Sequence, residues 1–291
     1  MENGIDLHIH STYSDGTCTP QQLVQLAKDI SLGAMSLTDH DTLEGIPVMR
    51  ELCRQNQIPF IPGIEISTDY YNKTKGIHKE VHMLGYFVDE TNTTLLSYLD
   101  EFHHLRNHRN EEMVALLQEH GFSITYKDLL EQNKNAVITR ANIARYLLDT
   151  NQVKSIKHAF DKYLGDDCCC FVQRKKVSCE KAIQMIHEAG GMAFIAHPPL
   201  YRLKEKELET LISHLKSEGL DGIEAVYSTY HNNEEQLMKH FAKEYHLLIS
   251  GGSDFHGSNK PYLHLGKGRG NLYVPFEIYE KIVESHEQTL L

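Results

Sequence analysis

Seven short apolar segments, each ending in polar residues, recur along the 291-residue chain. Apolar runs of this length, bounded by Gly, Pro and Asp, predict buried β-strands. Segments with helical features lie between several of them, and this alternation predicts a parallel α/β sheet, either a barrel or a doubly wound sheet. The predicted strands are residues 4–10, 34–40, 60–67, 81–88, 191–197, 222–227 and 247–254.

The helices expected between these strands have start and stop signals. Thr19 supplies an N-cap and Pro20 occupies the first turn of a helix over 21–32, which Gly33 ends. The other helices predicted between strands are residues 42–56, 178–189, 203–218 and 233–245.

One stretch breaks the alternation, because residues 95–177 contain no clear long strand and show apolar residues at helical spacing. We therefore predict a barrel whose first part is residues 1–95 and whose second part is 178–291. The helical insertion, residues 96–177, would cap the site and bind substrate. Within it, we interpret Cys168–Cys170 as a short buried strand.

The chain has 29 basic and 40 acidic residues, a formal net charge of −11. This balance argues against binding duplex DNA, which needs a basic surface, but it is compatible with a small anionic substrate. No apolar run is long enough to span a membrane, and the N-terminus lacks a signal-peptide pattern. We therefore expect a cytoplasmic protein with reduced cysteines and no membrane association.

Side chains that bind metals gather at the ends of the predicted strands. His8 and His10, two residues apart, point to one face of a strand, and the carboxyl ends of barrel strands converge on one side. A single histidine at a strand end is more often a polar residue with an ordinary partner, but six segments repeat this placement. Asp39 and Asp41 could instead orient an imidazole. The nine candidate ligands are His8, His10, Asp15, His40, Glu65, His82, His197, Asp254 and His256.

Several blocks of the sequence resemble one family. They are DLHIHSTYSDG (6–16), LTDHDT (37–42), PGIEIS (62–67), AHP (196–198) and GSDFHG (252–257). In this order they resemble the PHP family, the polymerase and histidinol phosphatase superfamily. The blocks at 81–89, 139–145, 161–164 and 225–228 are similar to its nucleotide-directed branch, which includes 3′,5′-nucleoside bisphosphate phosphatases and a 5′–3′ exoribonuclease that acts on short RNA.

The resemblance implies a distorted, TIM-like (β/α)7 barrel with a trinuclear metal centre. It assigns His8, His10, Glu65 and Asp254 to one ion. A second ion would share Glu65 and add His82 and His197, and a third would take Asp15, His40 and His256. We expect two or three divalent ions, with manganese first and iron, zinc or magnesium also compatible with the nitrogen and oxygen donors.

The expected chemistry follows from such ions. A water bridging two metals about 3.5–4 Å apart becomes a hydroxide near neutral pH and attacks phosphorus. For substrate binding we favour Arg140, which stands at a helix start where a guanidinium and the helix dipole both attract phosphate. His231, after the sixth predicted strand, could face the base or protonate the leaving oxygen. We interpret Arg174–Lys176 as a solvent-exposed basic run.

We therefore expect a metal-dependent phosphoesterase acting on nucleotides. It would convert a 3′,5′-nucleoside bisphosphate to the 5′-monophosphate, release mononucleotides 5′ to 3′ from short oligonucleotides, or do both. The alternatives are a phosphatase of another small phosphomonoester such as histidinol phosphate, and a non-catalytic PHP module that binds nucleotides. No protein partner is inferred.

Overall fold

An eight-stranded sheet forms the centre of the computed structural model, which describes residues 3–72, 74–134, 136–231 and 233–290. Seven strands follow the order β1-β2-β3-β4-β6-β7-β8, and the two-residue β5 pairs with β3. The strands are β1 (Asp6–Ile9), β2 (Met35–Leu37), β3 (Phe60–Asn72), β4 (Ile77–Tyr86), β5 (Val177–Ser178), β6 (Met192–Ile195), β7 (Gly222–Tyr227) and β8 (Leu248–Gly252).

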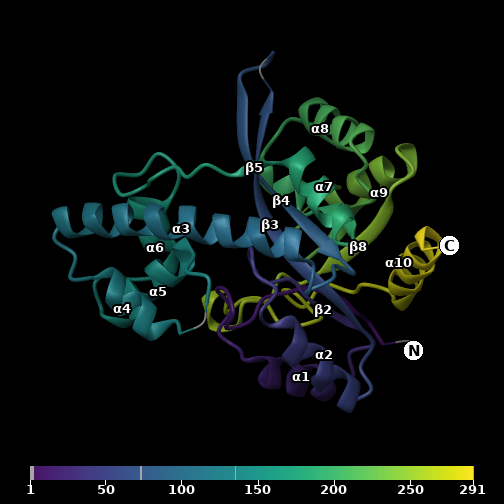
Figure 1. Ribbon diagram of the computed structural model, residues 1–291, viewed down its shortest axis with the longest axis horizontal. Helices are drawn as coiled ribbons and strands as arrows, with labels where there is room; N and C mark the ends of the chain where they lie inside the picture. The colour runs from purple at the N-terminus through teal and green to yellow at the C-terminus, as the bar shows by residue number, and fades with distance from the viewer. Residues whose placement is uncertain (1–2, 73, 135, 232, 291) are drawn as a thin grey trace.

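The sheet curves until its two edges meet. Ile9, the last residue of β1, and Phe255, just after β8, form an isolated parallel bridge, and the amide of Asp254 donates to the carbonyl of His8 at 2.9 Å. The result is a nearly closed, barrel-like α/β fold (Figure 1), as the sequence predicts. This closure brings residues near the two ends of the chain to the same place.

The expectation of an all-parallel sheet is wrong for β4, which runs antiparallel to both β3 and β6. β3 ends at Asn72 and β4 begins at Ile77, so the connection is far too short for the crossover that parallel strands require. Both strands also extend beyond their predicted bounds, and the hairpin they form projects from the body (Figure 1).

Helices pack around the outside of the barrel. Thr19 caps the first of them with a reciprocal capping box, as its sequence position predicts. A C-terminal helix, α10, has no counterpart among the predicted elements. The helices of the barrel are α1 (Pro20–Asp29), α2 (Ile46–Gln55), α7 (Cys179–Glu188), α8 (Glu205–Ser217), α9 (Glu234–Glu244) and α10 (Phe276–Thr289).

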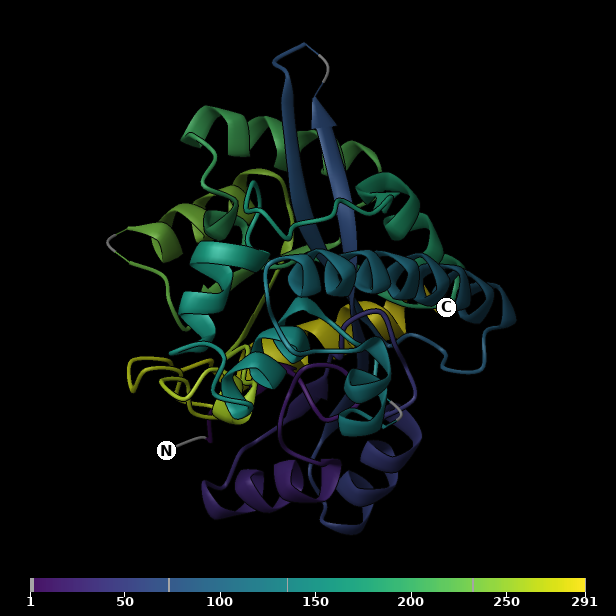
Figure 2. The ribbon, with the colours of Figure 1, turned by 90° about the vertical axis from the view of Figure 1, so that its left-hand side faces the viewer.

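The insertion is helical and has a core of its own. Its elements are α3 (Thr93–Glu119), α4 (Tyr126–Gln132), α5 (Arg140–Asp149), α6 (Ile156–Ala159) and the π-helix at Phe160–Leu164. Figure 2, in which this side faces the viewer, shows α3 crossing in front of the hairpin. Leu99 of α3 packs in the barrel core and Met113 in the insertion core, so one helix joins both. The boundaries at 96 and 177 stay a prediction.

Residues Cys168–Cys170 do not form the buried strand that we expected. They lie in turns, and Cys169 is exposed whereas Cys170 is buried. The amide of Cys170 donates to the carbonyl of Tyr163 at 3.0 Å, so the segment folds back on the π-helix instead of joining a strand.

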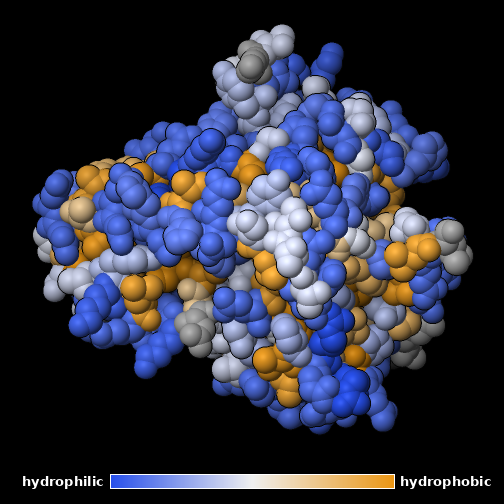
Figure 3. All heavy atoms as spheres, viewed as in Figure 1, coloured by the Kyte–Doolittle hydropathy of each residue, from blue (hydrophilic) through white to orange (hydrophobic). Residues whose placement is uncertain are grey.

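The visible face of the molecule is mostly hydrophilic, with apolar side chains in separate groups (Figure 3). Among the described residues, no helix has the length and apolar composition required to cross a membrane.

Candidate active site

The nine predicted ligands come together around the carboxylate of Glu65, which is buried on β3. One carboxylate thus touches donors from four separate parts of the barrel. Its oxygen Oε2 lies 3.2 Å from His8 Nε2, 3.1 Å from His10 Nε2 and 3.2 Å from His40 Nδ1. Its oxygen Oε1 lies 2.8 Å from His82 Nδ1 and 3.0 Å from His197 Nε2.

Two further carboxylates complete the arrangement. Asp254, just after β8, places Oδ1 at 3.3 Å from His10 Nε2 and at 3.2 Å from His256 Nδ1. Asp15, in the loop after β1, places Oδ1 at 3.1 Å from His256 Nε2 and Oδ2 at 3.8 Å from His40 Nε2. The donors therefore form a continuous chain from Glu65 through Asp254 to Asp15.

Four overlapping groups of these donors have ligand atoms within 4.8 Å of one another, close enough to hold an ion. One group contains all three donors expected for the third ion, and another contains three of the four donors expected for the first ion. His82 and His197, expected to bind the second ion together with Glu65, fall into two separate groups that each include Glu65. The groups are His10, Asp15, His40 and His256; His8, His10 and Asp254; His8, Glu65 and His197; and His40, Glu65 and His82.

The ring nitrogens of this cluster suit metal coordination. Neither ring nitrogen of His10 has a hydrogen-bond partner among the described residues, and the same holds for Nδ1 of His40 and of His197. Burial raises the pKa of Glu65, yet the nearby imidazoles of His40 and His8 hold that pKa well below its usual range. A buried, ionised carboxylate beside imidazole nitrogens that have no hydrogen-bond partner is a suitable environment for a divalent cation.

Glu224, buried in the middle of β7, positions two of these donors. Its Oε1 lies 2.9 Å from Nδ1 of His8, the nitrogen turned away from the centre, and its Oε2 accepts from the amide of His197 at 2.8 Å. This contact fixes the ring of His8 with Nε2 toward Glu65. We did not predict this role, although a carboxylate inside a buried strand signals a required partner.

Among the described residues, the carboxylates of Asp39 and Asp41 hydrogen-bond to groups other than imidazoles, contrary to one expectation. Asp39 accepts from the Ser11 amide at 2.8 Å and from the Ser14 hydroxyl, which fixes the loop after β1. Asp41 instead forms ion pairs with Arg106 and Arg174.

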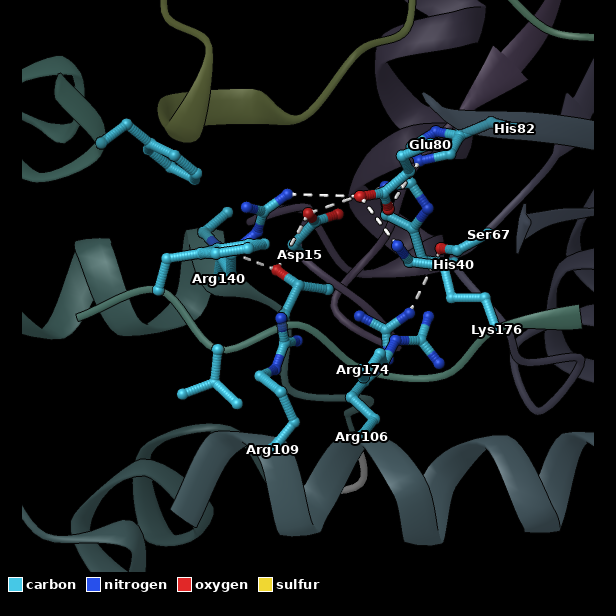
Figure 4. Close-up of a pocket in the computed structure, with 15 residues that line it drawn as sticks. Asp15, His40, Ser67, Glu80, His82, Arg106, Arg109, Arg140, Arg174 and Lys176 are labelled. Atoms are coloured by element: carbon cyan, nitrogen blue, oxygen red, sulfur yellow. Dashed lines mark hydrogen bonds and ion pairs between the residues drawn. The ribbon is translucent and has the colours of Figure 1, made fainter. Parts of the chain in front are cut away.

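Beside the centre lies a cationic cavity, here called the arginine pocket. The donors Asp15, His40 and His82 form one wall, so the pocket opens directly onto the centre. Figure 4 shows Arg106 and Arg109 rising from α3 toward it, with Arg140 facing Glu80. Its cations are Arg106, Arg109, Arg140, Arg174 and Lys176.

Arg109 differs from its neighbours because it forms no ion pair with a carboxylate of the described residues. Its Nε donates to Asn110 Oδ1 at 3.0 Å, and the side chain is buried. Burial, together with the charges of Arg106 and Arg140, lowers the pKa of Arg109 to about 8. The site therefore holds positive charge that the described carboxylates leave partly uncompensated.

Arg140, predicted to bind phosphate, lines this pocket at the start of α5. Its Nη2 lies 3.5 Å from Glu80 Oε2, its Nη1 donates to Asp166 at 2.8 Å, and its guanidinium lies 5.3 Å from the ring centroid of Phe171. Lys176 lies 3.2 Å from the same Glu80 oxygen. Glu80 is thus the anion that currently bridges two of the cations.

The interpretation of Arg174–Lys176 as a solvent-exposed run is wrong for Arg174, which is buried against Asp41. Arg106 and Arg109 were missed as well. A signal was present: both take inward positions in the apolar stripe of α3, between Phe102 and Met113, where a cation needs a buried partner.

His231 lies outside the arginine pocket. It lines a second cavity, here called the Tyr262 groove, which borders the centre on another side. Tyr227 and Lys260 form its inner end, and both donate to Oδ2 of Asp254, at 2.5 and 2.6 Å. The groove is also lined by Leu200, Arg202, Thr229, Glu234, Tyr262 and Arg269.

The chain is similar to known proteins over most of its length. The PHP domain family matches residues 6–258. The 5′–3′ exoribonuclease Rnm of Escherichia coli is 32% identical over 272 residues, covering 93% of this chain and 89% of the relative. The 3′,5′-nucleoside bisphosphate phosphatase of Chromobacterium violaceum is 32% identical over 253 residues, covering 87% of each chain.

Solved structures match over almost the whole length. A protein of Bifidobacterium adolescentis, assigned as a metal-dependent phosphoesterase, aligns with a TM-score of 0.84 and 28% identity, covering 97% of this chain and 96% of the other. An amidohydrolase of Chromobacterium violaceum, with bound sulfate and no metal, gives the same values. Because the family match spans most of the chain, the chain belongs to the PHP domain family.

Proposed function

We propose that this chain is a metal-dependent phosphoesterase that hydrolyses nucleotide phosphate esters. Its reactions are the conversion of a 3′,5′-nucleoside bisphosphate to the 5′-monophosphate and the release of 5′-mononucleotides from short oligonucleotides. Both reactions break the same bond, between phosphorus and the O3′ of the terminal nucleotide. The functions named for the relatives in Escherichia coli and Chromobacterium violaceum support both reactions.

The observation that carries the proposal is the arginine pocket beside the centre. Five cations surround a cavity whose wall includes Asp15, His40 and His82. An ester with one phosphate would use the centre alone, whereas a nucleotide with a 5′-phosphate and a 3′-phosphate can occupy the centre and the pocket together. Guanidinium groups suit the second phosphate because they bind it bidentately.

The proposed ligands are the nine residues around Glu65, and we expect two or three ions. An all-nitrogen and oxygen donor set suits manganese, iron, zinc or magnesium, and manganese is the ion we propose. Such ions lower the pKa of a coordinated water and spread the charge that develops on the phosphoryl oxygens. The arginines hold the second phosphate, and through it they orient the O3′–phosphorus bond over the centre.

Two other functions are less well supported. Histidinol phosphate has one phosphate and a cationic amine, which the arginine pocket would repel. A non-catalytic nucleotide-binding module would not require nine donors held together around one carboxylate.

Product analysis tests the proposal. With manganese present, the chain is offered adenosine 3′,5′-bisphosphate and a 5′-phosphorylated RNA pentamer. Release of inorganic phosphate from the first, with or without stepwise loss of mononucleotides from the second, supports the proposal. Hydrolysis of histidinol phosphate with neither nucleotide touched contradicts it.

The Asp254→Ala substitution should abolish turnover of both nucleotides, because Asp254 contacts both His10 and His256. Steady-state kinetics and circular dichroism together check this, since the fold should be largely retained. The matched control is Asp100→Ala, which removes a carboxylate exposed on α3. Wild-type activity in the Asp254→Ala variant would refute its role.

A further inference from the structure

The Tyr262 groove meets the centre at Asp254, whereas the arginine pocket meets it at Asp15, His40 and His82. A phosphate diester seated on the centre has two ester substituents. One is the terminal nucleotide, whose 5′-phosphate reaches the arginine pocket in the proposed function. The other substituent needs separate space, which a bisphosphate substrate would leave empty.

The side chains of the groove suit a single-stranded nucleotide. The ring of Tyr262 is 52% exposed, and the guanidinium of Arg269 lies 5.1 Å from its centroid. An exposed aromatic ring flanked by a cation is a stacking platform for a base.

The charge of the groove also favours the binding of a nucleotide. Arg202, Lys260 and Arg269 line it, and the carboxylate that it contains, Glu234, already accepts from the amide of His231 at 2.6 Å. Lys260 is held by Asp254 at the inner end, so the two cations left to meet a phosphate are the exposed Arg202 and Arg269. One cation of the groove, Lys260, thus contacts the centre, and Arg202 and Arg269 line the rest of the groove.

We propose that the Tyr262 groove binds the nucleotide on the 3′ side of the scissile phosphate, with its base on Tyr262 and its next phosphate near Arg269. This inference rests on the proposed function and adds to it the place where the downstream nucleotide binds. Water adds to phosphorus, the bond to O3′ of the terminal nucleotide breaks, and that oxygen takes a proton. The products are a 5′-mononucleotide in the arginine pocket and a shortened 5′-phosphorylated RNA in the groove.

Tyr262→Ala and Arg269→Ala test this assignment because neither residue contacts the donors. Stacking of one base accounts for enough binding that kcat/KM for the RNA pentamer should fall about tenfold in each variant. Adenosine 3′,5′-bisphosphate and para-nitrophenyl phosphate, which have no downstream nucleotide, should keep wild-type values. Tyr262→Phe should retain activity on the pentamer, since it keeps the ring.

The matched control is Tyr71→Ala, which removes a ring of similar exposure (58%) from the hairpin. Unchanged pentamer kinetics in Tyr262→Ala, or an equal loss on pentamer and bisphosphate, would overturn the groove assignment. Wild-type cleavage of the bisphosphate with an intact pentamer would overturn it too, while the phosphatase function stands. If the wild type hydrolyses neither nucleotide, the proposed function itself fails and the groove assignment fails with it.

Discussion

Arg109 is a buried cation whose neighbours are mostly other cations. Its charge is therefore a cost to the folded state unless an anion occupies the pocket. Arg106, one turn away on α3, differs because it forms a buried ion pair with Asp41. Variants of Arg109 and Arg106 therefore allow the effect of a pocket arginine on substrate binding to be measured separately from its effect on the stability of the fold.

Arg109→Met should raise the free energy of unfolding by about 1 kcal/mol, because it removes an uncompensated buried charge. The same change should lower kcat/KM for adenosine 3′,5′-bisphosphate at least about tenfold, since a hydrogen bond to a charged group contributes about 1.5–3 kcal/mol. Activity on para-nitrophenyl phosphate should persist. Thermal denaturation and steady-state kinetics measure the two effects.

Arg106→Met is the control, because it leaves Asp41 without one of its guanidinium partners. Its free energy of unfolding should fall by about 3–5 kcal/mol, the usual cost of breaking a buried pair. Destabilisation of Arg109→Met with unchanged kinetics would mean that Arg109 supports the fold and not the substrate.

Glu224→Gln should weaken metal binding by about 10–100-fold, as expected when the residue that orients a metal-binding histidine is changed. The substitution keeps the shape of the side chain but removes the charge beside His8. Activity measured against free manganese concentration gives the affinity, and the exposed Glu188→Gln on α7 is the control. An unchanged manganese dependence would exclude a positioning role for Glu224.

At the scale of single residues, the sequence predicted the residues that gather around Glu65 but not the residues that support them. His8, Glu65 and Asp254 could be found because each ends or interrupts an apolar run, which is a local signal. The partners of Glu224 and Arg109 are set by which strand or helix approaches them in space. A single sequence does not contain that information in readable form.

The α5 helix joins the arginine pocket to the centre. Its N-cap, Thr139, donates to Asp15 at 3.1 Å, and the next residue is Arg140. The start of one helix thus contacts both a donor and the pocket. Helix N-termini attract anions, which adds to the charge of the guanidinium.

Arg140→Ala should therefore reduce kcat/KM for the bisphosphate at least about tenfold, given the strength of charged hydrogen bonds. Para-nitrophenyl phosphate, which has no second phosphate, should be affected much less. Arg145→Ala is a control on the same helix, because Arg145 contacts Ser258 and Asn259 instead of the pocket. Equal losses on both substrates in Arg140→Ala would remove it from phosphate binding.

Elements differed in how far their sequence specified them. The helices with N-caps and amphipathic faces were found with small boundary errors, as for α1. The outer half of the β3–β4 hairpin was missed, because residues 68–80 are mostly polar and each strand there is stabilised by pairing with the other strand. The short connection between β3 and β4 requires the two strands to be antiparallel. We missed this constraint because the prediction relied on the alternation of strands and helices.

At the scale of the whole molecule, the centre joins the two edges of the sheet, because His8 of β1 lies beside Asp254, just after β8. Its donors come from the segments of β1, β2, β3, β4, β6 and β8, so an ion bound there would link strands that are distant in the chain. Ligands that bind only the folded state stabilise it by mass action. Metal content should consequently alter stability as well as activity.

Chelation with EDTA should abolish turnover and lower the melting temperature by several degrees, because ion binding at 100 times Kd contributes about 2.7 kcal/mol. Added manganese should restore both. Calorimetry and a phosphate-release assay measure the two on the same sample, and Asp254→Ala should show a reduced shift. Full activity after chelation and dialysis would refute a metal-dependent reaction.

Because β1 meets the segment after β8, the site can form only late in the synthesis of the chain. Asp6 and Ser253 contact each other from positions 247 residues apart, and the donors His8 and Asp254 lie beside them. The residues that line the arginine pocket extend in the chain only as far as Lys176, so all of them are synthesised well before Asp254 and His256. Ions can therefore bind at the complete centre only after the segment with Asp254 and His256 has been synthesised.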